Sequence, residues 1–512
     1  MVQLQTFASF MQSRFHRSPE GHLTDFMSRQ QGHLMLGGRV DLNVLAARYG
    51  TPLELAYLPQ ITRQVHAMMG WAAQAARATD YAGTFLYAYA TKANFAADVV
   101  RTALEAGAHY ETSAAADVEI AHHLWKQGIL KADRMLICNG SKEAHYTDAI
   151  LRLRRAGFSQ VISVLDDLEE FTTLRACPLP MQFGLREREA GNRDGSHPGN
   201  DRFGLTAAEM DAITAGVAGT PHAVVMYHAM IGSQVENADH FLTTLRASIR
   251  NYCELRQRVP TLRFFNYGGG TPTSGYRLDF EFDYTGFLTL LMEEMRALCA
   301  EYSVPMPDLV GEFGRYTVAN HSLFLFDVGQ VKAGGEGQPD WYLINGSLTV
   351  SAPDSVLVPD QRFIILPLDG WDRPVRPVRL GSRRTCDSDD VYPRPGNAPL
   401  MLPDSGVGTV IAVCGIGAYQ QMISGRGGAH HCLSPEPRRI IFEEKDGRLV
   451  QRVEAAQSQA DLMRLIGYQP ARQPAPMLPV HPPMWAPLTA SRRAKAVRLR
   501  QRPVIAQAGI PT

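Results

Sequence analysis

Between about Leu36 and Asn320, short runs of β-branched and aromatic residues alternate with longer amphipathic stretches that are rich in alanine and leucine. This alternation is typical of repeated βα units, in which parallel strands pair and helices cover them. Eight candidate strands fit the size of a closed (β/α)8 barrel, which takes roughly 250 residues. The sequence therefore predicts an α/β fold with a TIM-like barrel over residues 36–320. The candidate strands are Pro52–Tyr57, Thr84–Tyr89, Arg134–Cys138, Val161–Leu165, Gln182–Leu185, Ala223–Tyr227, Leu262–Tyr267 and Pro307–Gly311.

The character of the chain changes after Asn320. Runs rich in valine, isoleucine and leucine are broken by proline and glycine, and helical periodicity returns only at Ala455–Ile466. Single hydrophobic cores stop growing near roughly 250–300 residues, so the 512-residue chain should form a second, mainly β domain over 321–468. Its expected strands are Ser322–Val328, Trp341–Ile344, Arg362–Leu366, Gly408–Val413 and Arg438–Phe442.

The two ends of the chain are expected to lie outside these domains. Residues 1–35 are interpreted as an N-terminal extension. From Gln469 onward prolines recur and basic residues gather, so residues 469–512 are expected to be a disordered, Pro-rich basic tail. A role of this tail in binding RNA or a partner is the weaker interpretation. Its cations are Arg492, Arg493, Lys495, Arg498, Arg500 and Arg502.

The charge balance and the cysteines limit the class of function. Lys plus Arg and Asp plus Glu both number 51, so nothing points to nucleic acid or to a membrane surface. No uncharged apolar run reaches the roughly 18 residues of a membrane span. The seven cysteines are scattered, and no C-x-x-C pair gives the spacing of a metal or disulfide site. We expect a cytoplasmic protein with a small-molecule substrate.

Three strand ends carry reactive residues. Lys92 follows a predicted strand, and in a βα barrel this places its amine at the catalytic face. Asn266-Tyr-Gly268-Gly269-Gly270 offers backbone N–H groups that suit a phosphate, and Glu312-Phe-Gly-Arg315 pairs a carboxylate with a guanidinium. Singly, they are explained as well by a surface lysine, a tight turn and a salt bridge. Together they supply covalent attachment, phosphate binding and an anion for a protonated pyridine nitrogen, which are the needs of pyridoxal phosphate.

With these residues the chain resembles the fold-type III pyridoxal-phosphate-dependent decarboxylases, the group of ornithine, diaminopimelate and biosynthetic arginine decarboxylases. The resemblance runs from about Val40 to Phe442 and implies an alanine-racemase-like barrel, a β domain and pyridoxal 5'-phosphate as cofactor. It rests on six motifs in the family's order, namely Tyr87-Ala-Tyr-Ala-Thr-Lys92-Ala-Asn94, Ile231-Gly232-Ser233-Gln234, Tyr267-Gly268-Gly269-Gly270, Glu312-Phe-Gly-Arg315, Cys386-Asp387-Ser388-Asp389 and Gly417-Ala418-Tyr419.

The resemblance also implies the residues of the site. Lys92 would bind the cofactor covalently, Glu312 would face its ring nitrogen, and Glu111 stands where the family keeps an acidic residue. Directly before its hydrophobic-Gly-Ser motif the family has a histidine, where this chain has Met230, and His228 stands two residues earlier. The pattern leaves open which of the two covers the ring. The residues implied around the phosphate are Gly268, Gly269, Gly270, Arg315, Ser233 and Tyr419.

The resemblance implies a homodimer with shared active sites, in which the cysteine-containing loop of one subunit reaches the cofactor of the other. That loop here carries Cys386 and Asp387. Cys386 would return a proton to Cα after decarboxylation, a general-acid task that suits a thiol. The alternative interpretation of Cys386 is a buried small hydrophobe.

Three segments resemble biosynthetic arginine decarboxylase in particular, which favours arginine as substrate and agmatine, a precursor in polyamine biosynthesis, as product. A guanidinium or ammonium at the far end of a substrate needs carboxylates. Asp354, Asp387, Asp389 and Asp390 are the candidates. Ornithine, lysine and diaminopimelate stay open as substrates. The three segments are Ile137-Cys-Asn139-Gly140 with Lys142, Asp201-Arg-Phe203-Gly204-Leu205, and Ser351-Ala-Pro353-Asp354.

Two other functions stay open. A racemase would share the barrel and Lys92, although the Cys386-Asp387 loop argues against it. A non-catalytic regulatory partner of an active decarboxylase would be expected to have lost one of the reactive residues named above. No metal is expected at His430-His431-Cys432, because adjacent ligands rarely suit one tetrahedral ion and no second cluster completes the shell.

Overall fold

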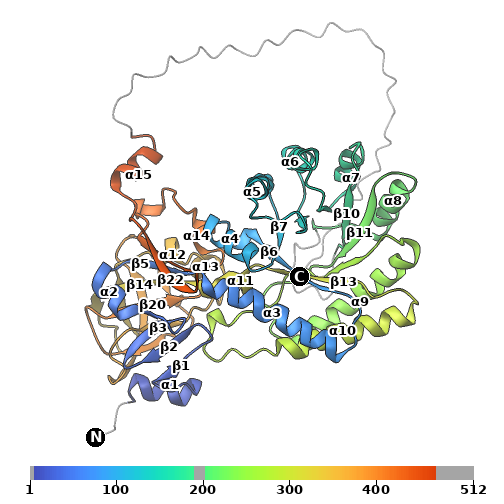
Figure 1. Cartoon of the computed structure of the whole chain (residues 1–512). Coiled ribbons are helices and arrows are strands. Elements are labelled where there is room, and N and C mark those ends of the chain that lie inside the picture. Colours follow the sequence, from blue (N-terminus) through green and yellow to red (C-terminus); the bar gives the residue numbers. More distant parts are fainter. Residues whose placement is uncertain (1–4, 189–201, 469–512) are drawn as a thin grey trace, which may run out of the picture. The chain divides into compact units, whose positions relative to one another are not determined.

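Eight parallel strands close into a barrel in the computed structural model, which describes residues 5–188 and 202–468. Around the barrel the strands follow the order β10-β11-β12-β13-β6-β7-β8-β9, and Figure 1 shows helices such as α5 to α8 on their outer side. The strands are β6 (Phe85–Ala90), β7 (His109–Thr112), β8 (Leu136–Cys138), β9 (Val161–Leu165), β10 (Gln182–Arg186), β11 (Ala223–His228), β12 (Phe264–Asn266) and β13 (Asp308–Phe313). The surrounding helices are α3 (Pro59–Ala78), α4 (Ala97–Glu105), α5 (Ala115–Lys126), α6 (Ala144–Arg155), α7 (Leu168–Arg175), α8 (Ala207–Val217), α9 (Ala238–Arg258) and α10 (Tyr284–Glu301).

The interior of the barrel is filled by apolar side chains. Successive residues of a strand point to opposite faces, so every second residue turns inward and the others pack against the helices. The inward residues form one buried cluster, which leaves only the ends of the barrel for chemistry. Its members are Ala88, Met135, Ile137, Ile162, Val164, Met226, Phe264 and Val310.

One of the eight predicted barrel strands is wrong. Leu53–Tyr57 (β5) lies in a different sheet, where it pairs with β14 (Ser322–Lys332) and β21 (Arg438–Lys445). The missing barrel strand is β7, whose sequence His-Tyr-Glu-Thr holds no apolar run. All five residues of β5 are buried, so its composition is that of an internal strand in either sheet. The other seven barrel strands are confirmed.

The second sheet is mixed and has ten strands within the described residues. The five runs expected to be strands after Asn320 each overlap an observed strand, and α15 (Gln459–Leu465) lies within the predicted helical stretch. The strands other than β5, β14 and β21 are β15 (Asp340–Ile344), β16 (Ile365–Pro367), β17 (Val375–Ser382), β18 (Val391–Tyr392), β19 (Leu400–Pro403), β20 (Val410–Cys414) and β22 (Arg448–Glu454).

The N-terminal residues also carry regular structure. Helix α1 (Phe7–Phe15) lies against Trp371, with the Phe7 and Trp371 rings 4.9 Å apart. A four-stranded sheet, β1 (Gly21–His22), β2 (Met27–Gln30), β3 (His33–Leu36) and β4 (Val40–Asp41), leads into α2 (Leu42–Tyr49). Contacts join the described residues up to Ile466 into one compact unit. The domain limits stay a prediction, and the predicted tail, 469–512, lies outside the described residues.

No helix in the described parts of the chain is long and apolar enough to cross a membrane.

A buried ion network ties β5 and β21 to the barrel helix α4. Glu54 accepts hydrogen bonds from Arg439 Nε at 3.1 Å and from Arg426 Nη2 at 2.6 Å. Arg439 also donates to Asp98 of α4 at 2.9 Å. The Glu54 and Arg439 side chains are only 4% and 6% exposed, so each charge depends on its partners.

Replacing Glu54 by glutamine should lower the free energy of unfolding by about 3 kcal/mol or more, because two guanidinium groups lose a buried partner. The measurement is the shift of the thermal unfolding transition. Glu444→Gln is the matched control: Glu444 pairs with Arg39 at 3.3 Å on the surface, and such pairs contribute under about 1 kcal/mol. Equal shifts for the two variants would contradict the importance of this network.

Candidate active site

A ring of polar side chains caps the apolar interior of the barrel at the carboxyl ends of its strands. Each member faces inward, and five of them stand two residues after a member of the apolar cluster. We call this set the barrel-mouth ring. It consists of Glu111, Asn139, Asp166, Arg186, His228, Asn266 and Glu312.

Two amides hold the carboxyl groups of the barrel-mouth ring together. The Nδ2 of Asn139 donates to Glu111 Oε1 at 2.8 Å and to Glu312 Oε1 at 2.9 Å. Asn266 Nδ2 donates to the same Glu312 oxygen at 2.7 Å. Glu111 is 1% exposed and Glu312 is 7% exposed. Two carboxyl groups are therefore buried side by side.

The two carboxyl groups titrate in opposite directions. Burial raises the pKa of Glu111 to about 8, and the charge of Glu312 adds to this rise. Burial also acts to raise the pKa of Glu312, but His228, the two amides and Lys92 outweigh it and leave this pKa below its usual value. At neutral pH the pair therefore holds one negative charge, on Glu312, because two adjacent buried carboxylates repel each other.

The His228 ring lies beside this charge, with Nε2 3.5 Å from Glu312 Oε1. Burial lowers the pKa of His228 to about 4, so its imidazole is neutral at physiological pH. The ring lowers the pKa of Glu312 in the acidic range, where it becomes charged, but it carries no charge at neutral pH. The hydrogen bonds from Asn139 and Asn266, together with Lys92, are then the main reason why Glu312 stays ionised.

Lys92 lies in the 3-10 turn η1 (Thr91–Ala93) that follows β6. Its side chain is exposed to solvent, although many protein atoms surround it. Desolvation by those atoms acts to lower the pKa of Lys92, but the nearby Glu111, Tyr419 and Glu312 leave it above its usual value. The structure thus brings the amine to the two carboxyl groups, with room for another molecule to reach it.

The glycine turn begins directly after β12. Gly268 and Gly270 have φ angles of 71° and 104°, which side chains other than glycine's rarely adopt. A Cβ on Gly268 would lie 2.8 Å from the carbonyl oxygen of Ala229 and 2.8 Å from the Met230 sulfur. The Gly269 N–H donates to that sulfur at 3.2 Å. A thioether is a weak acceptor, so this N–H stays available to a stronger acceptor such as an anion.

His228 and Met230 therefore contact different parts of the site. His228 lies beside Glu312, whereas Met230 lies against the glycine turn. Which of them covers the cofactor ring stays open. Ser233, the next implied phosphate ligand, is exposed.

Arg315 and Tyr419 meet at one side of the mouth. The Arg315 guanidinium lies 4.5 Å from the centre of the Tyr419 ring, and its Nη1 donates to Tyr276 Oη at 3.0 Å. Two contacts bring Tyr419 to the lysine turn: its N–H donates to the Ala93 carbonyl at 2.7 Å, and Asn94 donates to the Gly417 carbonyl at 2.8 Å. The Gly417-Ala418-Tyr419 motif is thus held against the segment that carries Lys92.

The predicted substrate carboxylates lie in two different settings. Asp354 is buried, accepts from Gln420 Nε2 at 2.7 Å and lies 3.6 Å from Arg315 Nη1, so its charge is already compensated. Cys386, Asp387 and Asp389 are exposed on the loop after β17. Asp387 pairs with His431, and among the described contacts none joins this loop to Lys92. The roles of these residues stay predictions.

Sequence reasoning missed Asn139, Arg186 and Asn266 as site residues. Arg186 lies within 3.8 Å of Asp166, a ring member that was missed too. The signal was available in the strand period: Asn139, Asn266 and Asp166 each follow by two positions a residue that faces the barrel interior. Lys142, noted in one of the substrate-related segments, is instead buried against Glu170 at 3.0 Å.

Several buried polar atoms at the mouth lack a hydrogen-bond partner within the described structure. They are Glu111 Oε2, both ring nitrogens of His228, Asn139 Oδ1 and Arg315 Nε. Proteins rarely leave such atoms unpaired. An exposed amine, an ionised carboxylate, a glycine turn and a guanidinium surround them, so the donors and acceptors fit a ligand with an aldehyde, a ring nitrogen and a phosphate.

Comparison with known proteins agrees with this chemistry. Residues 70–319 match the family model of the pyridoxal-dependent decarboxylase, pyridoxal binding domain. A biosynthetic arginine decarboxylase of Shewanella denitrificans is 28% identical over 214 residues, which cover 39% of this chain and 34% of that protein. The chain spans from about a third to about half of the length of the first curated relatives that it matches.

Solved structures share the fold. The biosynthetic arginine decarboxylase of Campylobacter jejuni superposes with a TM-score of 0.75 at 18% identity, over 87% of this chain and 91% of that one. A diaminopimelate decarboxylase of M. jannaschii gives a TM-score of 0.71 at 20% identity, over 86% and 98% of the two chains. Both likenesses support the barrel with its attached β sheet.

The titration of Glu111 should make stability depend on pH. A carboxyl whose pKa rises from 4.5 to about 8 on folding stabilises the fold fully below pH 4.5, and this contribution is lost as the pH rises toward 8. Thermal unfolding of the cofactor-free protein should therefore show a decline over this window, of the order of a few kcal/mol. Glu111→Gln should flatten it, whereas the exposed Glu143→Gln should not. An unchanged decline in Glu111→Gln would contradict the assignment.

Proposed function

We infer that the chain belongs to the fold-type III family of pyridoxal-phosphate-dependent decarboxylases, and we propose that it removes the α-carboxyl group of a basic amino acid as CO2. Arginine is the first candidate substrate, with agmatine as product. The observation that carries this proposal is the Lys92 amine, which is exposed beside one ionised and one neutral carboxyl group.

Each part of the barrel mouth has a place in this function. Lys92 would hold pyridoxal phosphate covalently, and Glu312 would face its ring nitrogen. The glycine turn, Ser233, Arg315 and Tyr419 would hold the phosphate. When bound, the cofactor supplies an electron-withdrawing ring that stabilises the negative charge left by the departing CO2.

The two carboxyl groups, Glu111 and Glu312, have different roles because they differ in protonation state. Glu312 is ionised and buried, so it can keep a proton on a nearby ring nitrogen through a charge-assisted hydrogen bond. Glu111 is neutral below about pH 8, and it therefore adds no second negative charge beside Glu312. Its free oxygen, Oε2, has no partner among the described residues and can accept or donate a hydrogen bond to the bound ligand.

Cys386 is proposed as the group that returns a proton to Cα. The neighbouring Cys432 raises the pKa of Cys386, so the thiol keeps its proton at neutral pH. Because the loop is exposed and is not joined to its own Lys92 by any described contact, we propose that it serves the partner subunit of a homodimer.

The choice of substrate follows from the available carboxylates. Asp354 is compensated by Arg315 and Gln420, which leaves Asp387 and Asp389 as the exposed candidates for a guanidinium or ammonium group. The names of the relatives favour arginine, whereas ornithine, lysine and diaminopimelate would place a cation at a similar distance from Cα.

Purified protein with added pyridoxal phosphate should release CO2 from one of arginine, ornithine, lysine and meso-diaminopimelate, with arginine expected. Lys92→Ala should lose both turnover and the lysine-dependent absorbance band of the cofactor. Lys131→Ala, an exposed lysine that contacts the Gly128 carbonyl, is the control and should retain both.

The outcomes separate the alternatives. Loss of stereochemistry at Cα without CO2 would indicate a racemase. Failure of the wild-type protein to bind the cofactor would reject the enzyme and leave a regulatory homologue.

A shared active site predicts complementation between two inactive variants. Lys92→Ala and Cys386→Ala should each reduce turnover by about 10²-fold or more. When the two are mixed under conditions that exchange subunits, roughly a quarter of the wild-type activity should return, because half of the dimers are mixed and each has one intact site. No recovery in mixtures that do form mixed dimers would contradict a loop that acts across the dimer.

A further inference from the structure

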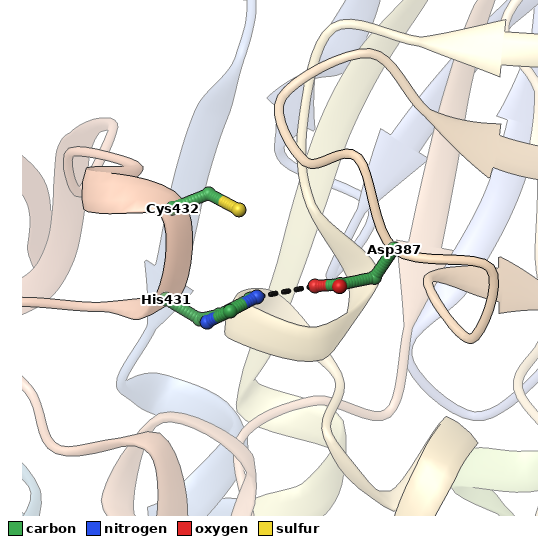
Figure 2. Close-up of side chains that lie close together, drawn as sticks. All are labelled: Asp387, His431 and Cys432. Atoms are coloured by element: carbon green, nitrogen blue, oxygen red, sulfur yellow. Dashed lines mark ion pairs between the residues drawn. The ribbon is translucent and has the colours of Figure 1, made fainter.

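The exposed loop that carries Cys386 meets a second loop with metal-binding side chains. Asp387, on the connection between β17 and β18, faces His431 and Cys432 of the 3-10 turn η5 (His431–Leu433) (Figure 2). One ligand atom from each of the three residues lies within 4.8 Å of the other two. Asp387 and His431 also form an ion pair.

The donors of this cluster suit one class of ion. A carboxylate oxygen, an imidazole nitrogen and a thiol sulfur are a mixed hard and soft set, which zinc accepts and which magnesium and calcium do not. Cys386 stands next to Asp387 in the chain and is exposed on the same loop, so it would supply a second sulfur when its side chain turns toward the other three. Four ligands of this kind complete a tetrahedral zinc shell.

Both objections from the sequence are met by the fold. The first was that adjacent residues rarely bind one ion, but Cys432 adopts φ 52° and ψ 25°, a left-handed conformation that turns its side chain to the side of His431 (Figure 2). The second was the lack of a second cluster. The loop of Cys386 and Asp387 provides that second cluster. Asp387 precedes His431 by 44 residues in the chain.

Both loops are anchored next to their ligands. On one side Asp390 is buried, and it accepts hydrogen bonds from the Leu348 N–H at 2.7 Å and the Thr349 N–H at 3.0 Å. On the other side His430 Nε2 lies 3.1 Å from Glu436. The ligands thus project from fixed points, which reduces the ordering that an ion must impose.

Only small movements of these side chains would bring their ligand atoms to the spacing of a zinc site. In a tetrahedral zinc site, bond lengths of about 2.0 Å to nitrogen or oxygen and about 2.3 Å to sulfur place the ligand atoms about 3.3–3.8 Å apart. The three ligand atoms lie within 4.8 Å of one another. Asp387 and His431, which form a direct ion pair, would have to separate to admit the ion, and Cys432 would have to move closer by about 1 Å. All three residues are exposed, and an ion can reach them directly.

We propose that Asp387, His431 and Cys432, with Cys386 as fourth ligand, form a binding site for zinc. The ion replaces the thiol protons of Cys386 and Cys432 and joins the two loops. Binding of zinc does not rest on the proposed function. The effect of zinc on catalysis does rest on it, since zinc would occupy the thiol that we propose as proton donor.

Thiol reactivity and cobalt spectra test the site in the full-length protein, kept reduced and loaded with pyridoxal phosphate. Cys386 and Cys432 are exposed, whereas the other five cysteines are buried, so two thiols should react with a thiol reagent in the native state. One equivalent of zinc should protect both. Cobalt(II) should give a thiolate-to-metal charge-transfer band at the same stoichiometry, and zinc should displace it.

Matched variants identify the ligands. His431→Ala should weaken zinc binding by about tenfold or more, and Cys432→Ser should remove the protection of Cys386. His145→Ala is the control: His145 also pairs with a carboxylate, Glu143, at 3.2 Å and is 68% exposed, against 62% for His431, but it has no cysteine beside it. Equal effects of His431→Ala and His145→Ala, or thiols that react alike with and without zinc, would overturn the proposal.

Activity is measured separately from binding. If the protein decarboxylates an amino acid, zinc at the same stoichiometry should inhibit it, a chelator should reverse the inhibition, and His431→Ala should require at least about tenfold more zinc. A protein that binds zinc as described but releases no CO2 without it would reject the proposed function and leave the zinc site intact.

Discussion

The hydrogen bonds from Asn139 and Asn266 to the Glu312 carboxylate are the interactions on which the barrel mouth depends. A buried carboxylate beside another carboxyl group is costly unless it is satisfied. The amides satisfy it and direct the remaining proton to Glu111. These residues lie on β7, β8, β12 and β13 or directly after them, so only closure of the barrel brings them together. The chemistry of the site is therefore a property of the whole barrel.

The mixed sheet completes this mouth from outside. Its strand β20 leads into Gly417 and Tyr419, and the contacts with Ala93 and Asn94 hold this segment against the lysine turn. A Cβ on Gly417 would lie 2.0 Å from the Val318 carbonyl oxygen, so the backbone can pass only without a side chain. Arg315, at the junction between the barrel and the sheet, is stacked on Tyr419. Barrel and sheet must therefore fold together to form this side of the site.

The sequence predicted the barrel, seven of its strands and the motifs at the mouth because these leave local signals. Lys92 and Glu312 stand at strand ends, and the glycine turn is visible as three consecutive glycines, Gly268, Gly269 and Gly270. Other features depend on partners that lie far away in the chain. The polar strand β7 reads as a loop because it lines the site, and β5 resembles any buried strand. Asn139 and Asn266 matter only through Glu312, which no local pattern reveals. The pairing of Asp354 with Arg315 and Gln420 likewise required the fold.

The loop after β17 has to be exposed and yet held in a fixed position. In the proposed function it must present a thiol and a carboxylate to another subunit, so both have to lie at the surface rather than in their own core. Asp390 makes this possible, since its buried hydrogen bonds fix the base of the loop while Asp387 and Cys386 project outward. Exposure also leaves the Asp387 charge free to pair with His431. In the proposed function, a cationic substrate group would have to displace that imidazole before it could use the same carboxylate. If both proposals hold, substrate and metal ion would compete for one small set of side chains.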